Sequence, residues 1–210
     1  GAMNEKFYSL SKEKQQAIIN AGYRVFSQNS YKKSPMQEVA DAAGISKSLL
    51  FHYFHNKKEF YMFLWTTCGK ISMSTMTSYG CYDRRDLFEM MERGLRAKID
   101  IMKKYPFMGS FVIRAYYETD PSIQPEIEKS YAELLSLEAA PSWSNLDPDQ
   151  FIEGVEPERI LREMYLVSEG YLWEIQKKGS LDIDEDIEKI EADFHEMIAF
   201  WKKIYLRKMG

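Results

Sequence analysis

Cysteine and long apolar stretches are both scarce in this sequence of 210 residues. Its two cysteines, Cys68 and Cys81, are too few for a disulfide framework, and they lack the spacing of metal ligands. No apolar run approaches the roughly 18 to 20 residues of a membrane span, and no signal peptide is visible. We therefore expect a cytoplasmic protein with no membrane partner. Gly1 and Ala2, ahead of Met3, look like the remnant of a cleaved tag.

The sequence also lacks the patterns that carry catalysis. We find no glycine-rich phosphate loop, no nucleophile with a neighbouring base and no pair of catalytic carboxylates. His52 and His55 stand three residues apart, but the further ligands of a metal site do not accompany them, and His195 stands alone. We therefore expect a protein that is not an enzyme and that holds neither a metal nor a cofactor.

The charge is unevenly divided along the chain, although the overall composition is that of an ordinary globular protein. The net charge is −4, yet residues 1–60 hold nine lysines and arginines against five acidic residues. The remaining residues hold 19 basic and 27 acidic side chains. A basic end on an acidic body directs phosphates toward one end of the molecule. The alternative is an uneven surface charge that has no meaning for function.

A stretch near the N-terminus predicts two short helices joined by a tight turn. Ser34 is expected to cap the first helix, with Pro35 at its first position and Gln37 as the partner of a capping box. Gly44 ends this helix, since a residue without Cβ fits a left-handed turn, and Ser46 caps the second. The pattern is typical of a helix-turn-helix, whose second helix enters the major groove of DNA.

From about Gln16 to Leu64 the chain resembles the N-terminal domain of the TetR family of transcriptional regulators. The matching segments are AIINAGYRVF, SPMQEVADAAGISKSLLFHYF and NKKEF, in the family's order and spacing. Four departures stand out. Gly22 replaces a usual alanine, and Asn29-Ser30 stands where a glycine-containing turn usually precedes Tyr31. Leu49 stands where a small or hydroxyl residue is common, and Phe51 replaces a usual tyrosine.

The rest of the sequence predicts further helices, and no strand pattern is recognisable. Ser11 caps the helix before the helix-turn-helix, Asp83 is expected to open a helix, and two strongly apolar helices close the chain. Residues 139–157 read as a long connection with one turn. We predict an all-α fold with a three-helix DNA-binding domain over 1–56 and a helical domain for effector binding and dimerisation over 57–210.

Side chains of the helix-turn-helix segment are the candidates for DNA contact. Lys47, at the start of the second helix, is the best candidate for reading guanine, and Ser34 lies at a helix N-terminus that favours anions. The full set is Ser34, Lys47, Ser48, Leu49, His52, Tyr53 and Lys57. The resemblance implies phosphate contacts for His52, Tyr53 and Lys57. The alternative for each is an ordinary surface side chain.

The resemblance implies two further sites in the body of the protein. The family has an apolar effector pocket between the central helices, although aromatic residues at helical spacing are often only core. The candidates for this pocket are Trp65, Cys68, Phe107, Phe111, Tyr116, Tyr117 and Trp143. The family also pairs its last two helices with those of a second copy. The candidates for that interface are Met164, Tyr171, Ile190, Phe194, Met197 and Trp201.

The function implied by the resemblance is regulation of transcription. We expect a homodimer that represses genes from a palindromic operator in double-stranded DNA. A small apolar or amphipathic effector would release it. Two alternatives remain open: a constitutive DNA-binding protein without an effector, and a helical protein that binds small molecules and has lost DNA binding.

Overall fold

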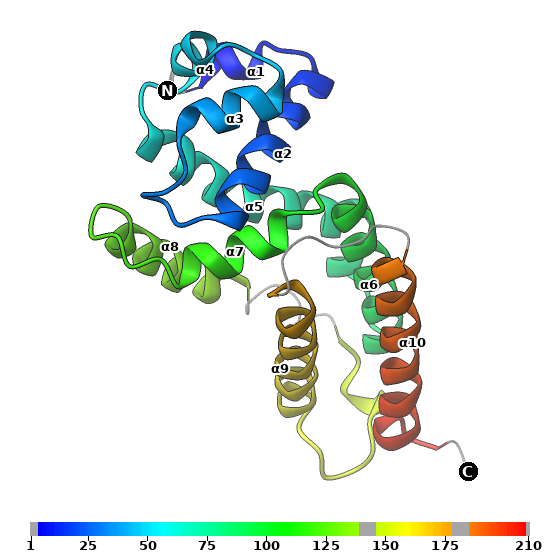
Figure 1. Cartoon of the computed structure of the whole chain (residues 1–210). Helices are drawn as coiled ribbons and strands as arrows, with labels where there is room; N and C mark the ends of the chain where they lie inside the picture. The colour runs from blue at the N-terminus through cyan, green and yellow to red at the C-terminus, as the bar shows by residue number, and fades with distance from the viewer. Residues whose placement is uncertain (1–3, 139–145, 178–184, 209–210) are drawn as a thin grey trace. The chain divides into compact units, whose positions relative to one another are not determined.

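All regular elements in the described part of the chain are helical. The computed structural model describes residues 4–138, 146–177 and 185–208 (Figure 1). In these residues the only β contact is an isolated bridge between Phe151 and Leu206. The predicted all-α fold is thereby confirmed. None of the helices in these ranges has the length and apolar character that a membrane span requires.

The chain divides into two compact units that alternate along the sequence. The first comprises residues 1–70, 105–131 and 176–180, and the second comprises residues 71–104, 132–175 and 181–210. Helix α5 (Lys57–Ser78) supplies residues to both units. The two compact units therefore do not meet at the boundary expected after residue 56. That boundary separates a DNA-binding domain from an effector-binding domain, and this division of function stays a prediction.

The first unit is built around the aromatic side chains of α5. Phe7 is fully buried, and its ring lies 5.3 Å from the ring of Phe54 and 5.0 Å from that of Phe63. These contacts explain a short first helix that no pattern in the sequence predicts. The other helices of the unit besides the first part of α5 are α1 (Glu5–Tyr8), α2 (Lys12–Gln28), α3 (Met36–Ala43), α4 (Lys47–Tyr53), α7 (Met108–Tyr116) and the first part of α8 (Gln124–Glu138).

Two helix starts of the first unit follow from the local capping that the sequence predicts. Ser11 Oγ accepts from the backbone N–H of Lys14 at 3.2 Å, and Ser46 Oγ accepts from that of Leu49 at 3.1 Å, as predicted. The expected cap at Ser34 is wrong. Its hydroxyl donates instead to the carbonyl of Ser30 at 2.7 Å, because a backbone acceptor in the preceding turn is within reach.

Gly22 marks a close approach between α2 and α5. A Cβ at this position would lie 2.6 Å from Leu64 Cδ1 and 2.9 Å from Phe60 Cζ, well inside van der Waals contact. The large side chains of α5 therefore require a glycine here. This packing explains the departure from the alanine that is usual in the TetR family.

The second unit packs α6 and α10 against each other over a core of aliphatic and aromatic side chains. Besides the last parts of α5 and α8, its elements are a short turn η1 (Cys81–Asp83), α6 (Leu87–Lys104), a short turn η2 (Pro148–Gln150), α9 (Pro157–Gln176) and α10 (Glu185–Tyr205). The predicted start of α6 at Asp83 is wrong. The carboxylate of Asp86 accepts from the backbone N–H of Phe88 at 2.8 Å and so fixes the start at Leu87.

Gln150 joins three segments of the second unit that are distant in the sequence. Its side-chain oxygen accepts from the backbone N–H of Leu87 at 2.9 Å, and its carbonyl accepts from that of Arg207 at 2.8 Å. The turn that holds it is capped by Asp147, whose carboxylate accepts from the N–H of Asp149 at 3.0 Å. This turn confirms the one predicted inside the connection 139–157, of which residues 139–145 lie outside the described residues.

Candidate nucleic-acid interface

Helix α4 presents one polar face and buries the other. Leu50 and Phe54 are fully buried, and they anchor the helix against the core of the first unit. The turn before it depends on Gly44, whose φ of +71° lies in the left-handed region that favours glycine. The outward side chains are Lys47, Ser48, Leu49 and His52, all of them exposed. Four of the five predicted DNA-contacting residues of this helix are therefore exposed.

The exposed face of α4 combines four kinds of group. They are the ammonium of Lys47, the hydroxyl of Ser48, the imidazole of His52 and the apolar side chain of Leu49. Lys47 Nζ lies 5.8 Å from the centre of the Phe51 ring, which keeps the ammonium at the start of the helix. Tyr53 is half-buried, with its ring 5.6 Å from that of His52. Leu49 is 38% exposed. Such a set can donate to base edges and phosphates and contact a thymine methyl group.

Two predicted DNA-binding residues have a different environment. Ser34 is fully buried, so its hydroxyl is turned away from any phosphate, and this corrects the expectation for its side chain. Lys57 Nζ donates to the carbonyl of Tyr31 at 2.8 Å and to that of Ser34 at 3.3 Å. Burial lowers the pKa of this ammonium, and the nearby carboxylates of Asp120 and Glu118 oppose the shift. Lys57 thus binds the protein's own backbone.

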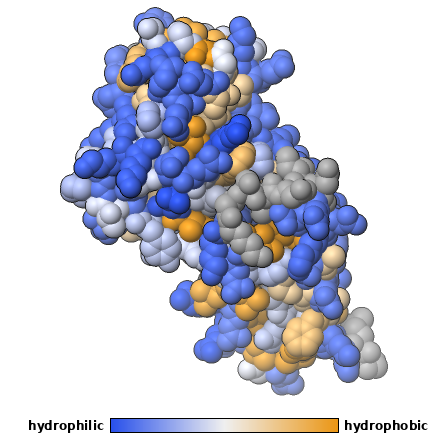
Figure 2. All heavy atoms as spheres, in the orientation of Figure 1, coloured by the Kyte–Doolittle hydropathy of each residue, from blue (hydrophilic) through white to orange (hydrophobic). Residues whose placement is uncertain are grey.

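Further basic side chains lie on the surface of the same unit. Hydrophilic residues predominate over the N-terminal helices on the face seen in Figure 2. The exposed basic residues of the first 40 positions are Lys6, Lys12, Lys14, Arg24, Lys32 and Lys33. They carry the positive charge that the sequence concentrates at this end of the chain.

The candidate effector residues fall into different environments. Trp65 and Cys68 are buried in the first unit, where Trp65 Nε1 donates to Ser130 Oγ at 2.9 Å. The Cys68 thiol donates to the hydroxyl of Tyr23 at 3.2 Å, and its burial raises the pKa of the thiol to about 12. Phe111 is fully buried, and its ring centre lies 5.0 Å from that of Tyr23.

The remaining effector candidates lie nearer the surface. Tyr116 and Tyr117 are 43% and 63% exposed, with ring centres 5.1 Å apart, and Phe107 is half-buried. Trp143 lies outside the described residues. The structure therefore buries Trp65, Cys68 and Phe111 in the first unit and leaves the two tyrosines on the surface. A common effector pocket stays a prediction.

Four of the six expected dimerisation residues belong to the core of the chain itself. Met164, Ile190, Phe194 and Trp201 are all buried in the core of the second unit, which corrects the expectation that they face a partner. The sequence could not separate the faces, because α9 and α10 are apolar on both sides. The exposed apolar residues of these helices are Tyr165, Leu166, Val167, Phe200 and Ile204.

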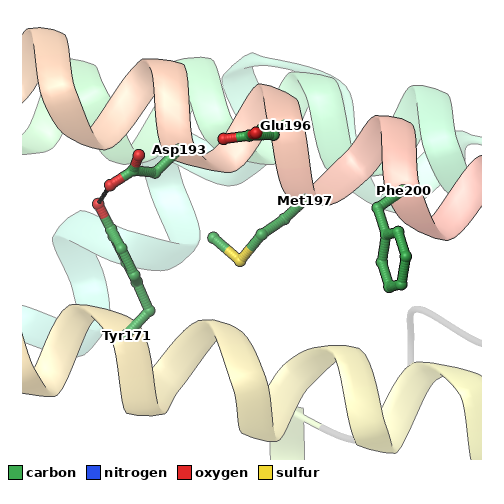
Figure 3. A pocket seen from close by; sticks show the side chains of 5 residues that line it. All are labelled: Tyr171, Asp193, Glu196, Met197 and Phe200. Carbon is green, nitrogen blue, oxygen red and sulfur yellow. Dashed lines mark hydrogen bonds between the residues drawn. The ribbon is translucent and has the colours of Figure 1, made fainter.

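The other two expected dimerisation residues line a groove between α9 and α10. The groove has a volume of about 430 Å³ and is lined by Tyr171, Asp193, Glu196, Met197 and Phe200. Figure 3 shows Tyr171 reaching from α9 toward Asp193, while Met197 points into the groove. The Tyr171 hydroxyl donates to Asp193 at 2.5 Å, and bonds from Lys189 and Tyr171 lower the pKa of that carboxyl.

Residues 18–61 match the family model described as bacterial regulatory proteins, tetR family. The matched range contains the whole of α3 and α4 and the turn between them. This segment is therefore similar to the DNA-binding domain of the TetR family. The resemblance noted in the sequence is confirmed over these residues.

Individual TetR-family relatives are distant. The HTH-type transcriptional regulator RutR of Escherichia coli K12 is 25% identical over 129 residues, which are 60% of this chain and 59% of the relative. The protein of the same description from Escherichia coli O157:H7 is 22% identical over the same shares. The match thus spans about three fifths of the length of these relatives.

Solved TetR-family structures share the fold of this chain at low identity. A regulator from Chloroflexus aurantiacus J-10-fl has a TM-score of 0.56 and 16% identity, with 99% of this chain and 100% of that chain covered. The regulator FadR of Bacillus subtilis, solved in complex with stearoyl-CoA, has a TM-score of 0.54 and 16% identity, with 87% and 96% covered. At these identities the likeness is one of fold.

Proposed function

We propose that this protein is a ligand-responsive repressor of the TetR family. As a homodimer it binds a palindromic operator, and a small apolar or amphipathic effector releases it. The observation that carries the proposal is the outer face of α4, where Lys47, Ser48, Leu49 and His52 are exposed together on a helix anchored by buried Leu50. A helix with a polar outer face after a glycine turn is suited to the major groove.

The side chains of α4 divide into base readers and phosphate contacts. Lys47 can donate to O6 and N7 of guanine, and Leu49 can pack against the methyl group of thymine. Ser48 can bond either to a base or to a phosphate. We assign His52 and Tyr53 to phosphates, so that they fix the orientation of the helix on the duplex. Removing Lys47 should therefore change sequence preference, whereas removing Tyr53 should weaken binding to all sequences.

Dimerisation is supported by the exposed apolar side chains of α9 and α10. Leu166 is 54% exposed and Phe200 is 60% exposed, and both lie on helices whose inner sides already fill the core. Apolar side chains appear in Figure 2 over α9 and α10 as well. A two-fold pair of such faces would bury them in a four-helix interface and place two α4 helices on two half-sites.

Release by an effector follows from linkage between two sites. The aromatic side chains around α5 and α7 are the candidates for binding it, and FadR of Bacillus subtilis, which shares the fold, was solved in complex with stearoyl-CoA. An amphipathic acyl compound is therefore a reasonable first class of effector. If the effector weakens operator binding, the operator must weaken effector binding by the same factor.

The first test is selection of bound DNA from a randomised duplex pool, read by sequencing and by fluorescence anisotropy. The expected result is enrichment of a palindrome with half-sites about one helical turn apart. Lys47→Ala should lose that preference, and Tyr53→Ala should weaken binding overall. Lys129→Ala, which removes an exposed charge on α8, is the matched control and should bind as the unaltered protein does.

The two alternatives give different results in the same experiments. A constitutive DNA-binding protein would enrich a palindrome that no acyl compound or other amphipathic molecule releases. A protein that has lost DNA binding would enrich no sequence, and its weak DNA affinity would not depend on salt, since no counterions would be released.

A further inference from the structure

The loop between α2 and α3 is held from both sides by charged groups. This loop covers residues 29–35 and leads directly into the helix-turn-helix. Tyr31 in this loop is buried, and both polar groups of its backbone are bound by ionic side chains. A loop whose backbone is fixed in this way determines where the following helix begins.

Glu118 binds the backbone N–H of Tyr31. The acceptor is Glu118 Oε2, and the distance is 3.0 Å. Glu118 is only 9% exposed, and its other carboxylate oxygen accepts from the backbone N–H of Asp120 at 3.3 Å. The carboxylate comes from the segment between α7 and α8, which is 87 positions away from Tyr31 in the sequence. A buried carboxylate that accepts two N–H groups is a strong and well-oriented contact.

Lys57 binds the carbonyl side of the same residue. Its ammonium donates to the carbonyl oxygens of Tyr31 and Ser34, and it lies 4.6 Å from the centre of the Tyr31 ring. The Tyr31 ring packs in turn against Tyr61 of α5, with ring centres 5.1 Å apart. The carbonyl of Ser34 immediately precedes Pro35, the N-cap of α3. Lys57 therefore fixes the entry to α3 as well as the loop.

A second contact joins α7 to the end of α2. Arg114 Nε donates to the carbonyl of Ser27 at 3.0 Å, and α2 and α7 pack against each other. The end of α2 is thus held by α7, and the loop that follows is held at Tyr31 by Glu118 and Lys57. Since α3 packs against α4, a shift of the loop would move the DNA-reading helix.

We propose that Glu118 and Lys57 are positioning residues for DNA binding, which act by clamping the backbone of Tyr31 and so set the orientation of α3 and α4. We call these three residues the Tyr31 clamp. The proposal rests on the proposed function and gives Lys57 a role other than phosphate contact. It also makes the segment after α7 part of the apparatus that determines operator affinity.

The salt dependence of binding separates positioning from phosphate contact. A lysine that neutralises one phosphate contributes about 0.9 to the slope of log affinity against log salt. A positioning residue changes the affinity and leaves this slope unaltered. Lys57→Met retains the aliphatic stem, and Glu118→Ala removes the acceptor, whereas Glu118→Gln keeps an acceptor oxygen. Lys47→Met is the control for a direct contact.

The experiment measures affinity for the selected operator at four or more salt concentrations, with helicity of each variant checked by circular dichroism. Glu118→Ala and Lys57→Met should each weaken binding by about two- to thirtyfold with an unchanged slope. Glu118→Gln should lie between Glu118→Ala and the unaltered protein. The double variant should lose no more than the larger single loss, because both residues act on one loop. Lys47→Met should weaken binding to the operator more than binding to a duplex in which the guanine that Lys47 reads is replaced.

Hydrogen exchange gives a readout that does not depend on DNA. The amide of Tyr31 should exchange faster in Glu118→Ala, since its acceptor is removed. The proposal is overturned if that amide exchanges at the unaltered rate. It is also overturned if Lys57→Met lowers the slope by about 0.9 while Glu118→Ala binds normally. If the unaltered protein binds no operator, the proposed function fails, and hydrogen exchange alone decides whether the clamp exists.

Discussion

Gly22 shows how one missing methyl group sets the distance between two helices. Gly22→Ala would place a Cβ against Leu64 and Phe60, so α2 and α5 must separate or these side chains must leave their rotamers. We expect a loss of about 1–3 kcal/mol in the free energy of unfolding, measured by urea denaturation. Gly170→Ala is the control, since a Cβ there meets nothing within 4 Å. It should be neutral or slightly stabilising, by up to about 1 kcal/mol.

The buried thiol of Cys68 makes stability depend on alkaline pH. Burial raises the pKa of this thiol to about 12, whereas in the unfolded chain it titrates near the ordinary value of about 8.5. The unfolded state therefore releases the proton first, and stability falls as pH rises from about 8.5 to 12. One such group lowers the free energy of unfolding by about 1.4 kcal/mol for each pH unit within that range.

The measurement is urea denaturation at pH 8 and pH 10 for the unaltered protein and for Cys68→Ala. The variant should be less stable at pH 8, because it loses packing and a contact with Tyr23. Its stability should nevertheless fall less between the two pH values. Equal falls in the two proteins would show that the Cys68 thiol does not titrate between the folded and unfolded states as described.

At the level of elements, α9 and α10 each have two apolar sides with different partners. The inner side fills the core, and the outer side presents Leu166, Phe200 and Ile204 to solvent. We expect Phe200→Glu to weaken dimerisation by about 2–4 kcal/mol, as for a central interface residue. Lys203→Glu, at an exposed position of α10, is the control for added negative charge. Sedimentation at several protein concentrations measures the dimerisation of both variants. An unaltered dimer in Phe200→Glu would contradict the proposed interface.

Local signals predicted the helix-turn-helix well and failed where a second partner competes. Ser46 and Gly44 act as expected because their partners lie within four residues. Ser34 offers the same signal, but the Ser30 carbonyl captures its hydroxyl. The Tyr31 N–H donates to Glu118, which is 87 positions away, and no periodic pattern in the sequence predicts such a contact. The core face of α9 was hidden because both of its sides are apolar.

For the whole molecule, the unequal division of charge predicts a direction of DNA binding. The first 60 residues are positive and the remainder negative, although the total is only −4. Replacing both Lys12 and Lys14 by glutamine should reduce the salt dependence of DNA affinity by about 0.9 for each lysine that meets a phosphate. The same change at Lys202 and Lys203 of α10 should leave it unaltered. If the two double variants changed the salt dependence of DNA affinity equally, DNA binding at the basic end of the chain would be contradicted.

The alternation of the two units along the chain has a consequence for synthesis on the ribosome. The second unit needs α6 and α10, so its core cannot close until residues 185–205 have been made. The helices of the first unit are complete much earlier, once the chain has passed residue 131. The apolar side of α6 must therefore wait, uncovered, while about half of the protein is still being translated. During that interval the apolar side of α6 is open to a chaperone. The rate of translation through the second half of the chain determines how long this side stays exposed.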